Sequence, residues 1–322
     1  MALISVIVIT LISTSFLGFS YGQLRVGFYS SVCPKAEEIV SSVVREAFLV
    51  DNNMAAILLR LHFHDCFVNG CDGSILIEGQ NAERHAFGHQ GVNGFDVIER
   101  AKSQLERVCP GVVSCADIVA MAARDSISLS NGPRYQVQTG RRDGRVSNVS
   151  SASIMPEVNE SIQQLKSKFL QKGLSEKDLV LLSAAHTIGT TACFFMTDRL
   201  YNFPTTGSDP SINPRFLPEL KSRCPQKGDV NARLPMDHGS PLRFDSQILR
   251  NIRDGFAVLQ SDAKLYDDKV TRGIIDSYFG ILSSVVGPSF EADFVDSIVK
   301  MGRLGVNTGS QGEIRRVCRV FN

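Results

Sequence analysis

Eight cysteines constrain the fold of this 322-residue chain more strongly than any other feature. All of them lie after residue 22, and no two have the Cys-x-x-Cys spacing that is typical of zinc sites. An even number of cysteines in a secreted chain predicts four disulfides, although their spacing alone leaves the pairing open. The eight residues are Cys33, Cys66, Cys71, Cys109, Cys115, Cys193, Cys224 and Cys318.

Residues 1–22 have the features of a secretory signal peptide. Residues 2–19 are apolar or small and uncharged, and the small residues Ser20 and Gly22 precede Gln23 at the usual cleavage positions. We therefore expect a mature domain at 23–322, with a membrane anchor at the N-terminus as the alternative. Two N-glycosylation sequons, at Asn148 and Asn159, lie in a Ser-rich stretch and predict an exposed loop.

The remaining sequence predicts a mainly α-helical fold with little β-structure. Apolar residues make up 43% of the chain, which excludes a disordered protein, and 34 basic against 33 acidic residues give no excess of charge for nucleic-acid binding. Long loops are expected near 70–93, 140–158 and 202–242. Patterns typical of helices cover 36–51, 54–66, 94–108, 114–129, 159–172, 175–185, 244–254, 270–282 and 291–301.

The segment 60–66 combines an arginine with a histidine at helical spacing. Arg60 and His64 are four residues apart and share one helix face, whereas His62 should face elsewhere. A neighbouring arginine disfavours protonation of a histidine, so His64 could accept a proton while Arg60 stabilises negative charge. A surface arginine beside a structural histidine is the alternative.

Two further segments are candidates for chemistry. Residues 65–74 offer carboxylates, a hydroxyl and a glycine-permitted turn, which suit calcium, although an Asx-rich turn closed by Cys66 and Cys71 is the alternative. His186 follows an apolar helix pattern among small residues, which leave room for a flat, bulky group. By itself, such a histidine is more often a packed core residue.

Several motifs in a fixed order resemble those of the secretory plant, or class III, haem peroxidases. The resemblance extends over 23–322 and includes Arg-Leu-His-Phe-His-Asp-Cys-Phe-Val-Asn-Gly-Cys-Asp-Gly-Ser at 60–74 and Leu-Ser-Ala-Ala-His-Thr-Ile-Gly at 182–189. Shorter matches are Val-Ser-Cys-Ala-Asp at 113–117, Gly-Arg-Arg-Asp-Gly at 140–144, Asp-Arg-Leu-Tyr-Asn-Phe at 198–203 and Gln-Ser-Asp at 260–262. The resemblance implies helical distal and proximal halves that enclose one haem b.

The resemblance also implies roles for individual residues. His186 resembles the axial ligand of the haem iron, and Asp262 resembles the carboxylate that accepts its other ring N–H. His64 resembles the distal base, which takes a proton from H2O2 and returns it to the oxygen that leaves as water, while Arg60 stabilises the developing charge. The carbonyl of Pro156 resembles a donor-binding position.

Two calcium sites and a disulfide pairing follow from the same resemblance. The distal calcium set is Asp65, Val68, Gly70, Asp72 and Ser74, with Glu83 as a water-mediated partner. The proximal set is Thr187, Asp237, Ser240, Arg243 by its carbonyl, and Asp245. The implied disulfides are Cys33–Cys109, Cys66–Cys71, Cys115–Cys318 and Cys193–Cys224.

His89 departs from the family pattern, because it stands where an asparagine usually orients the distal histidine. An unprotonated ring nitrogen of His89 could still accept the N–H of His64, whereas a protonated His89, or one pointing to solvent, could not. The departure therefore suggests an alternative function, a secreted haem- and calcium-binding protein with weakened catalysis. A cell-wall protein without haem is a third possibility, which His186 and Asp262 together disfavour.

The resemblance implies a secreted peroxidase that reduces H2O2 and oxidises small phenolic donors by one-electron steps, as in cell-wall lignin or suberin metabolism and the response to oxidative stress. We expect a monomer that contacts neither nucleic acid nor, after signal cleavage, a membrane. The signal peptide, and the absence of a C-terminal extension, favour the cell wall or apoplast.

Overall fold

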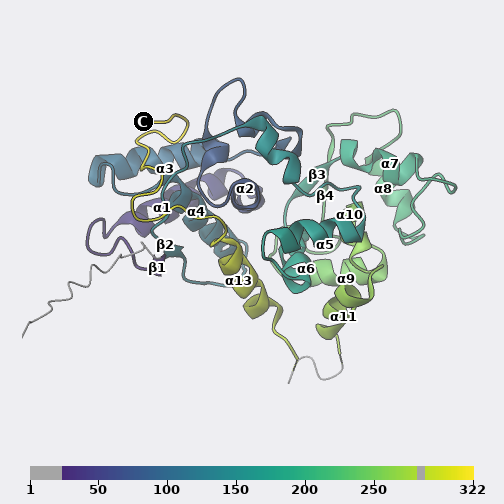
Figure 1. Cartoon of the computed structure of the whole chain (residues 1–322). Coiled ribbons are helices and arrows are strands. Elements are labelled where there is room, and N and C mark those ends of the chain that lie inside the picture. Colours follow the sequence, from purple (N-terminus) through teal and green to yellow (C-terminus); the bar gives the residue numbers. More distant parts are fainter. Residues whose placement is uncertain (1–23, 281–286) are drawn as a thin grey trace, which may run out of the picture.

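The computed structural model describes residues 24–280 and 287–322 and consists mainly of α-helices. The predicted signal peptide and Gln23 lie outside the described residues. Figure 1 shows one group of helices, α1–α4, beside a second group, α5–α11, with α13 running between them. The helices are α1 (Ala36–Val50), α2 (Met54–Val68), α3 (Phe95–Val108), α4 (Cys115–Leu129), α5 (Ile162–Gln171), α6 (Glu176–Ser183), α7 (Thr197–Tyr201), α8 (Leu217–Arg223), α9 (Gln247–Asp254), α10 (Gln260–Lys264), α11 (Lys269–Ser277) and α13 (Phe290–Met301).

The first group is built around α4, which is buried along most of its length and contacts α1, α2 and α3. Its alanines permit this close packing, and the Ser114 side chain caps its N-terminus by accepting from the backbone N–H of Asp117. The apolar stripe of α1 that includes Val40 and Val44 faces the same core. This core therefore fixes α2, which carries Arg60 and His64.

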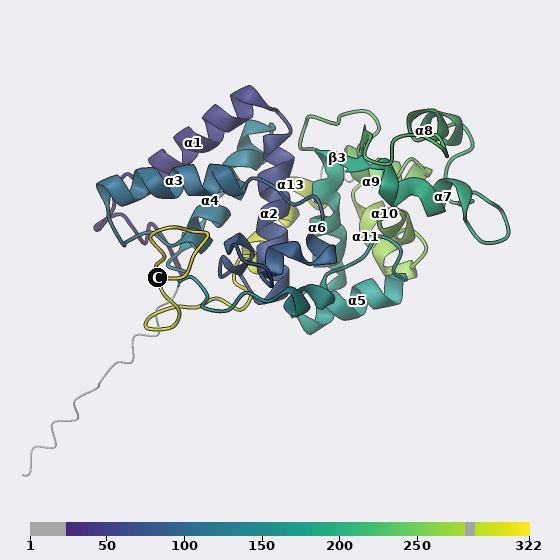
Figure 2. The same ribbon diagram turned by 90° about the horizontal axis from the view of Figure 1, so that it is seen from above.

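The second group is built around α6, which contacts α5, α11 and α13. Both α5 and α6 begin with a capping box, formed by Ser161 with Gln164 and by Ser175 with Asp178. A second core joins these helices to one side of α2, and Figure 2 shows α13 close to both α2 and α6. The short segment that contains His186 follows α6 directly, so its position depends on this packing.

Within the described residues, β-structure consists of two short antiparallel strand pairs and a few isolated β-bridges. The strands β1 (Arg25–Val26) and β2 (Gln138–Thr139) form one pair, and β3 (Thr190–Ala192) and β4 (Arg233–Pro235) form the other. The predicted class, mainly helical with little β-structure, is therefore confirmed. In the second pair, β4 of the 202–242 segment lies beside β3, which follows His186 in the sequence.

Several helix ends that the sequence predicted were wrong. The helix expected at 159–172 begins at Ile162, the one expected at 244–254 begins at Gln247, and α11 ends at Ser277 within the range 270–282, part of which lies outside the described residues. The loop expected at 202–242 contains α8, and α7 and α10 were not predicted. These helices have five to seven residues, too few to show a periodic pattern.

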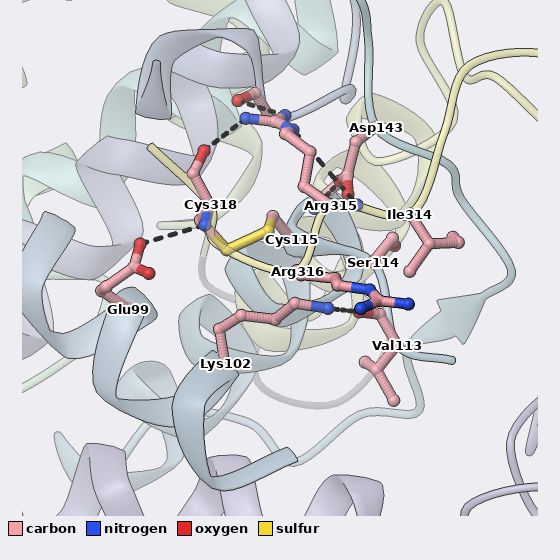
Figure 3. Close-up of a disulfide and its surroundings, with 12 residues drawn as sticks. Glu99, Lys102, Val113, Ser114, Cys115, Asp143, Ile314, Arg315, Arg316 and Cys318 are labelled. Carbon is pink, nitrogen blue, oxygen red and sulfur yellow. Dashed lines mark hydrogen bonds and ion pairs between the residues drawn. A yellow bond between two sulfur atoms is a disulfide. The ribbon is translucent and has the colours of Figure 1, made fainter. Parts of the chain in front are cut away.

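Four disulfides are confirmed, and they join the pairs that the resemblance implies. They are Cys33–Cys109, Cys66–Cys71, Cys115–Cys318 and Cys193–Cys224. Figure 3 shows how Cys115–Cys318 ties the C-terminal segment to the start of α4, where the backbone N–H of Cys318 also donates to Glu99. Beside this disulfide, the buried Arg315 lies against the buried carboxylate of Asp143.

None of the helices in the described ranges has both the length and the hydropathy that a bilayer span requires.

Candidate active site

His186 lies in a short 3-10 helix, Ala184–Thr187, directly after α6. Its Nδ1 is 3.0 and 2.9 Å from the two carboxylate oxygens of Asp262, which comes from α10 and is 1% exposed. Burial lowers the pKa of His186, but the charge of Asp262 and its hydrogen bond outweigh this effect and hold the pKa above its ordinary value. Because Nδ1 is committed to Asp262, only Nε2 is left for another ligand.

Arg60 and His64 lie on α2, where their spacing places them on one face as predicted. Arg60 donates from Nη2 to the carbonyl of Gln90 at 3.1 Å, and burial together with the charge of Arg233 lowers its pKa to about 10. Burial, followed by the charges of Arg60, His89 and His186, lowers the pKa of His64 well below its ordinary value. A neutral imidazole beside a fixed guanidinium can accept a proton.

His62 faces away from this pair, as the helical spacing predicts. Its Nδ1 is 3.5 Å from the sulfur of Cys66, and its side chain is buried. It therefore belongs to the packing around the Cys66–Cys71 disulfide.

His89 does not point to solvent, so that alternative is wrong. It ends a 3-10 helix, Phe87–His89, is 2% exposed, and places its Nδ1 2.8 Å from the Nδ1 of His64. On its other side, His89 Nε2 is 3.3 Å from Oε1 of Glu83. His89 is thus the hydrogen-bonding partner of His64.

The two histidine groups offer what a haem needs. His186 keeps Nε2 available, and its side chain is 34% exposed although Asp262 and Thr187 are buried. The segment Ala184–Thr187 contacts α2, and the charges of His186 and Arg60 act on His64. A histidine with a free Nε2 and a histidine that can accept a proton therefore lie in one neighbourhood, and this arrangement fits a haem between them.

The structure brings the proximal calcium set together around one hydroxyl. Thr187 Oγ1 donates to Asp237 Oδ2 at 2.9 Å and lies 3.4 Å from both the carbonyl of Arg243 and Oδ1 of Asp245. Ser240 Oγ is 3.0 Å from Oδ1 of Asp245. Hydroxyl, carboxylate and carbonyl oxygens of this kind are the ligands that calcium prefers.

The distal calcium set also gathers in one place. Asp65 is fully buried, and neither of its carboxylate oxygens has a hydrogen-bond partner among the described residues. Burial and the charges of Asp72 and Glu83 raise the pKa of Asp65 well above its ordinary value, and burial raises that of Asp72 to about 6. Arg315 offsets part of the charge of Asp65 and Asp72, but burial and the neighbouring carboxylates outweigh it, and such a cluster of buried carboxylates fits a bound cation. Gly70, which has a positive φ of 109°, and Ser74 join this turn.

Three contacts made by residues of the two calcium sets were not predicted from the sequence. Lys172 donates to the carbonyl of Val68 at 2.6 Å, Asn251 donates to Asp237 at 2.8 Å, and Gly144 lies so close to Asp72 that a Cβ would stand 2.1 Å from its Oδ2. Each partner lies on a distant segment, so no local pattern could reveal it. Among the described residues, no three His, Cys, Asp or Glu side chains are arranged to bind a metal by themselves. The two calcium sets differ from such a group because they also include hydroxyl and carbonyl oxygens.

The other predicted site residues lie near the surface. Pro156 is half-buried and follows the 3-10 helix Val149–Ile154, which packs against the segment that carries His89. Asn148 and Asn159 are exposed. Oδ1 of Asn148 caps that 3-10 helix by accepting from Ser150, and the carbonyl of Asn159 accepts from Lys264.

Comparisons with known proteins identify the family of this chain. A family model described as Peroxidase matches residues 40–280. The chain is 65% identical to Peroxidase 43 of Arabidopsis thaliana over 311 residues, which cover 96% of this chain and 95% of that protein. It is 57% identical to Peroxidase 13 of Arabidopsis thaliana, with 95% of each covered, and 52% identical to Peroxidase N1 of Nicotiana tabacum, with 92% and 90% covered.

Proposed function

We propose a residue-level mechanism for this chain, which belongs to the peroxidase family and is an enzyme that uses haem to reduce hydrogen peroxide at the expense of a donor. The observation that carries the proposal is the His186–Asp262 pair within electrostatic reach of Arg60 and His64. His89 meets His64 with a ring nitrogen, so the alternative of weakened catalysis is not favoured.

His64 acts as the base and then as the acid of peroxide reduction. Its Nε2 takes a proton from one oxygen of H2O2 and returns it to the other oxygen, which leaves as water. The lowered pKa of His64 keeps the ring neutral and ready to accept that proton. Arg60 is held by the Gln90 carbonyl and stabilises negative charge as the O–O bond breaks.

His186 and Asp262 hold the cofactor, for which we propose haem b. Nε2 of His186 would hold the iron, while Asp262 accepts the N–H at Nδ1, which fixes the ring orientation and would make this nitrogen more basic. The haem supplies the redox chemistry that no side chain provides.

The donor is proposed to be a small phenol, bound near the carbonyl of Pro156 and oxidised by one electron at a time. We further propose that the chain is secreted to the cell wall or apoplast as a monomer, after cleavage before Gln23, with glycans at Asn148 and Asn159. The mature domain is then 23–322. Cell-wall lignin or suberin metabolism and the response to oxidative stress are functions that suit such an enzyme.

The proposed function is tested by stopped-flow spectroscopy of the purified protein. We expect a Soret band, a rapid spectral change on mixing with H2O2, and return to the resting spectrum in two steps when a phenol is added. Absence of a Soret band would support a structural wall protein. A Soret band without turnover of any phenol would support a haem-binding protein with weakened catalysis.

We also propose two calcium ions, one held by Asp65, Val68, Gly70, Asp72 and Ser74 with Glu83 through water, and one by Thr187, Asp237, Ser240, Arg243 and Asp245. Asp65 is next to His64 and Thr187 is next to His186, so each ion would fix the backbone of one catalytic histidine.

Chelation of calcium is therefore expected to reduce the rate of reaction with H2O2 and to accelerate haem release. Activity should return with calcium but not with magnesium, because these flexible oxygen sets do not match the compact octahedron that magnesium requires. Haem transfer to an acceptor protein measures the release. Metal analysis that finds no calcium in the purified protein would contradict both sites.

A further inference from the structure

Arg233 has a fixed side chain but no acidic partner. It lies on β4, where its Nε donates to Oγ1 of Thr190 at 2.7 Å and its Nη2 donates to the carbonyl of the same residue, also at 2.7 Å. Thr190 is neutral, and no carboxylate among the described residues forms an ion pair with Arg233. The guanidinium is therefore held in place with its charge uncompensated and with Nη1 left for another acceptor.

The strand pair turns Arg233 away from the nearest core. Leu234 and its cross-strand partner Thr191 are buried, and Leu234 packs with Leu200 of α7 and Leu220 of α8. Successive side chains of a strand point to opposite faces, so Arg233 lies on the other face of the pair. Figure 1 and Figure 2 both show β3 between α2 and the helices α7 and α8. The face that carries Arg233 is thus directed toward α2.

The chain enters β3 beside the face of α2 that carries the two distal residues. A Cβ on Gly189 would stand 2.7 Å from the Cβ of Ala56, so the two segments are in close contact. Ala56, Arg60 and His64 follow one another at intervals of four and share one face of α2. Burial and the charge of Arg233 lower the pKa of Arg60. Arg60 and Arg233 therefore border the same space, in front of His64.

This space has two cations and needs an anion. Arg60 donates to the carbonyl of Gln90 and, within the described parts of the chain, forms no ion pair with a carboxylate. Two such charges repel each other unless an anion lies nearby. Haem b carries two carboxylates on one edge of an otherwise apolar ring, and a carboxylate is costly to bury without a partner. The exposed Arg233 would meet such a carboxylate at the rim of the pocket.

We propose that Arg233 binds a carboxylate of the haem and thereby anchors the cofactor at the exposed rim of its pocket. The two bonds to Thr190 orient the guanidinium in advance, so little side-chain freedom is lost on binding. The inference rests on the proposed role of His186 as the iron ligand, which places the ring next to β3, because Thr190 follows His186 by four residues. It concerns binding alone and includes no redox or proton-transfer step.

Haem release from the purified enzyme tests this anchor. Arg233→Gln removes the charge but keeps a side chain that can donate to Thr190. We expect haem transfer to an acceptor protein to become about three to ten times faster, between the effects of losing an exposed ion pair and a hydrogen bond to a charged group. High salt should reduce the difference, and Arg233→Lys, which keeps the charge, should lie closer to the wild type.

Arg223→Gln is the matched control for this measurement. Arg223 is another exposed arginine near β4, where it lines a cavity together with Leu234, but its charge is already paired with Glu219. Its replacement should leave the rate of haem release unchanged.

Haem dimethyl ester separates an ionic anchor from a structural role. The ester has the same ring and iron as haem but no carboxylate charge, and it can be exchanged for haem in the wild type and in Arg233→Gln. An ionic anchor predicts that the substitution no longer changes the rate of release. If Arg233 only holds β4 to β3 through Thr190, the substitution should accelerate the release of both cofactors equally. That result would overturn the inference.

Unchanged haem release in Arg233→Gln would also overturn it. If the KM for a carboxylated phenol then rose while that of its uncharged analogue did not, Arg233 would bind the donor in place of the cofactor. Failure of the proposed haem site is distinguishable from these results. In that case His186→Ala would retain haem as well as the wild type does, whatever the behaviour of the Arg233 variants.

Discussion

Replacing His64 with alanine should slow the reaction with H2O2 by at least about 10²–10⁴-fold, the contribution typical of a general acid–base group. The substitution removes the only proposed proton acceptor near Arg60, but it leaves His186 and Asp262 in place. The variant should therefore still bind haem and show a Soret band. Stopped-flow measurement of the second-order rate constant tests this prediction.

His62→Gln is the matched control for this experiment. His62 is a buried histidine on the same helix, but it lies against Cys66 and not beside Arg60. The His62→Gln substitution should lower the stability of the protein more than it lowers the second-order rate constant with H2O2. A His64→Ala enzyme that reacts with peroxide at close to the wild-type rate would remove His64 from the mechanism.

The sequence predicted the long helices because each shows an apolar stripe over several turns. Helix α3 is a clear case, because it buries Val97, Ala101 and Leu105 on one face. Helix α2 is buried on several faces, and there the helical spacing alone aligns Arg60 with His64. The position of Asp262 had no such local signal. It lies in α10, a helix of five residues, and was assigned to His186 only from the resemblance to a known family.

The contacts around His64 were less predictable still. His89 and Glu83 lie in a loop of short 3-10 helices, where side-chain direction does not follow a repeating pattern. The sequence left His89 facing either His64 or solvent, and only the three-dimensional packing, which buries His89, decides between them. The approach of Glu83 to His89 was not predicted, because the sequence suggested only a calcium role for Glu83.

Replacing His186 with alanine is expected to have the largest effect on cofactor binding. The substitution removes the proposed axial ligand itself, so haem affinity should fall by more than the roughly 10–100-fold caused by losing only a partner of a ligand. The ratio of Soret to protein absorbance, measured after gel filtration, gives the bound haem. His85→Ala is the control, because it also removes one histidine but from an exposed position.

Added imidazole distinguishes a lost ligand from a damaged fold in this variant. The Asp262 carboxylate remains buried and can accept one N–H of an imidazole molecule, just as it accepts the N–H of His186. Imidazole should then present its other nitrogen to the iron and restore haem binding. In His186→Ala combined with Asp262→Leu, this rescue should disappear, because nothing orients the added ring. Full haem retention by His186→Ala without imidazole would show that another residue ligates the iron.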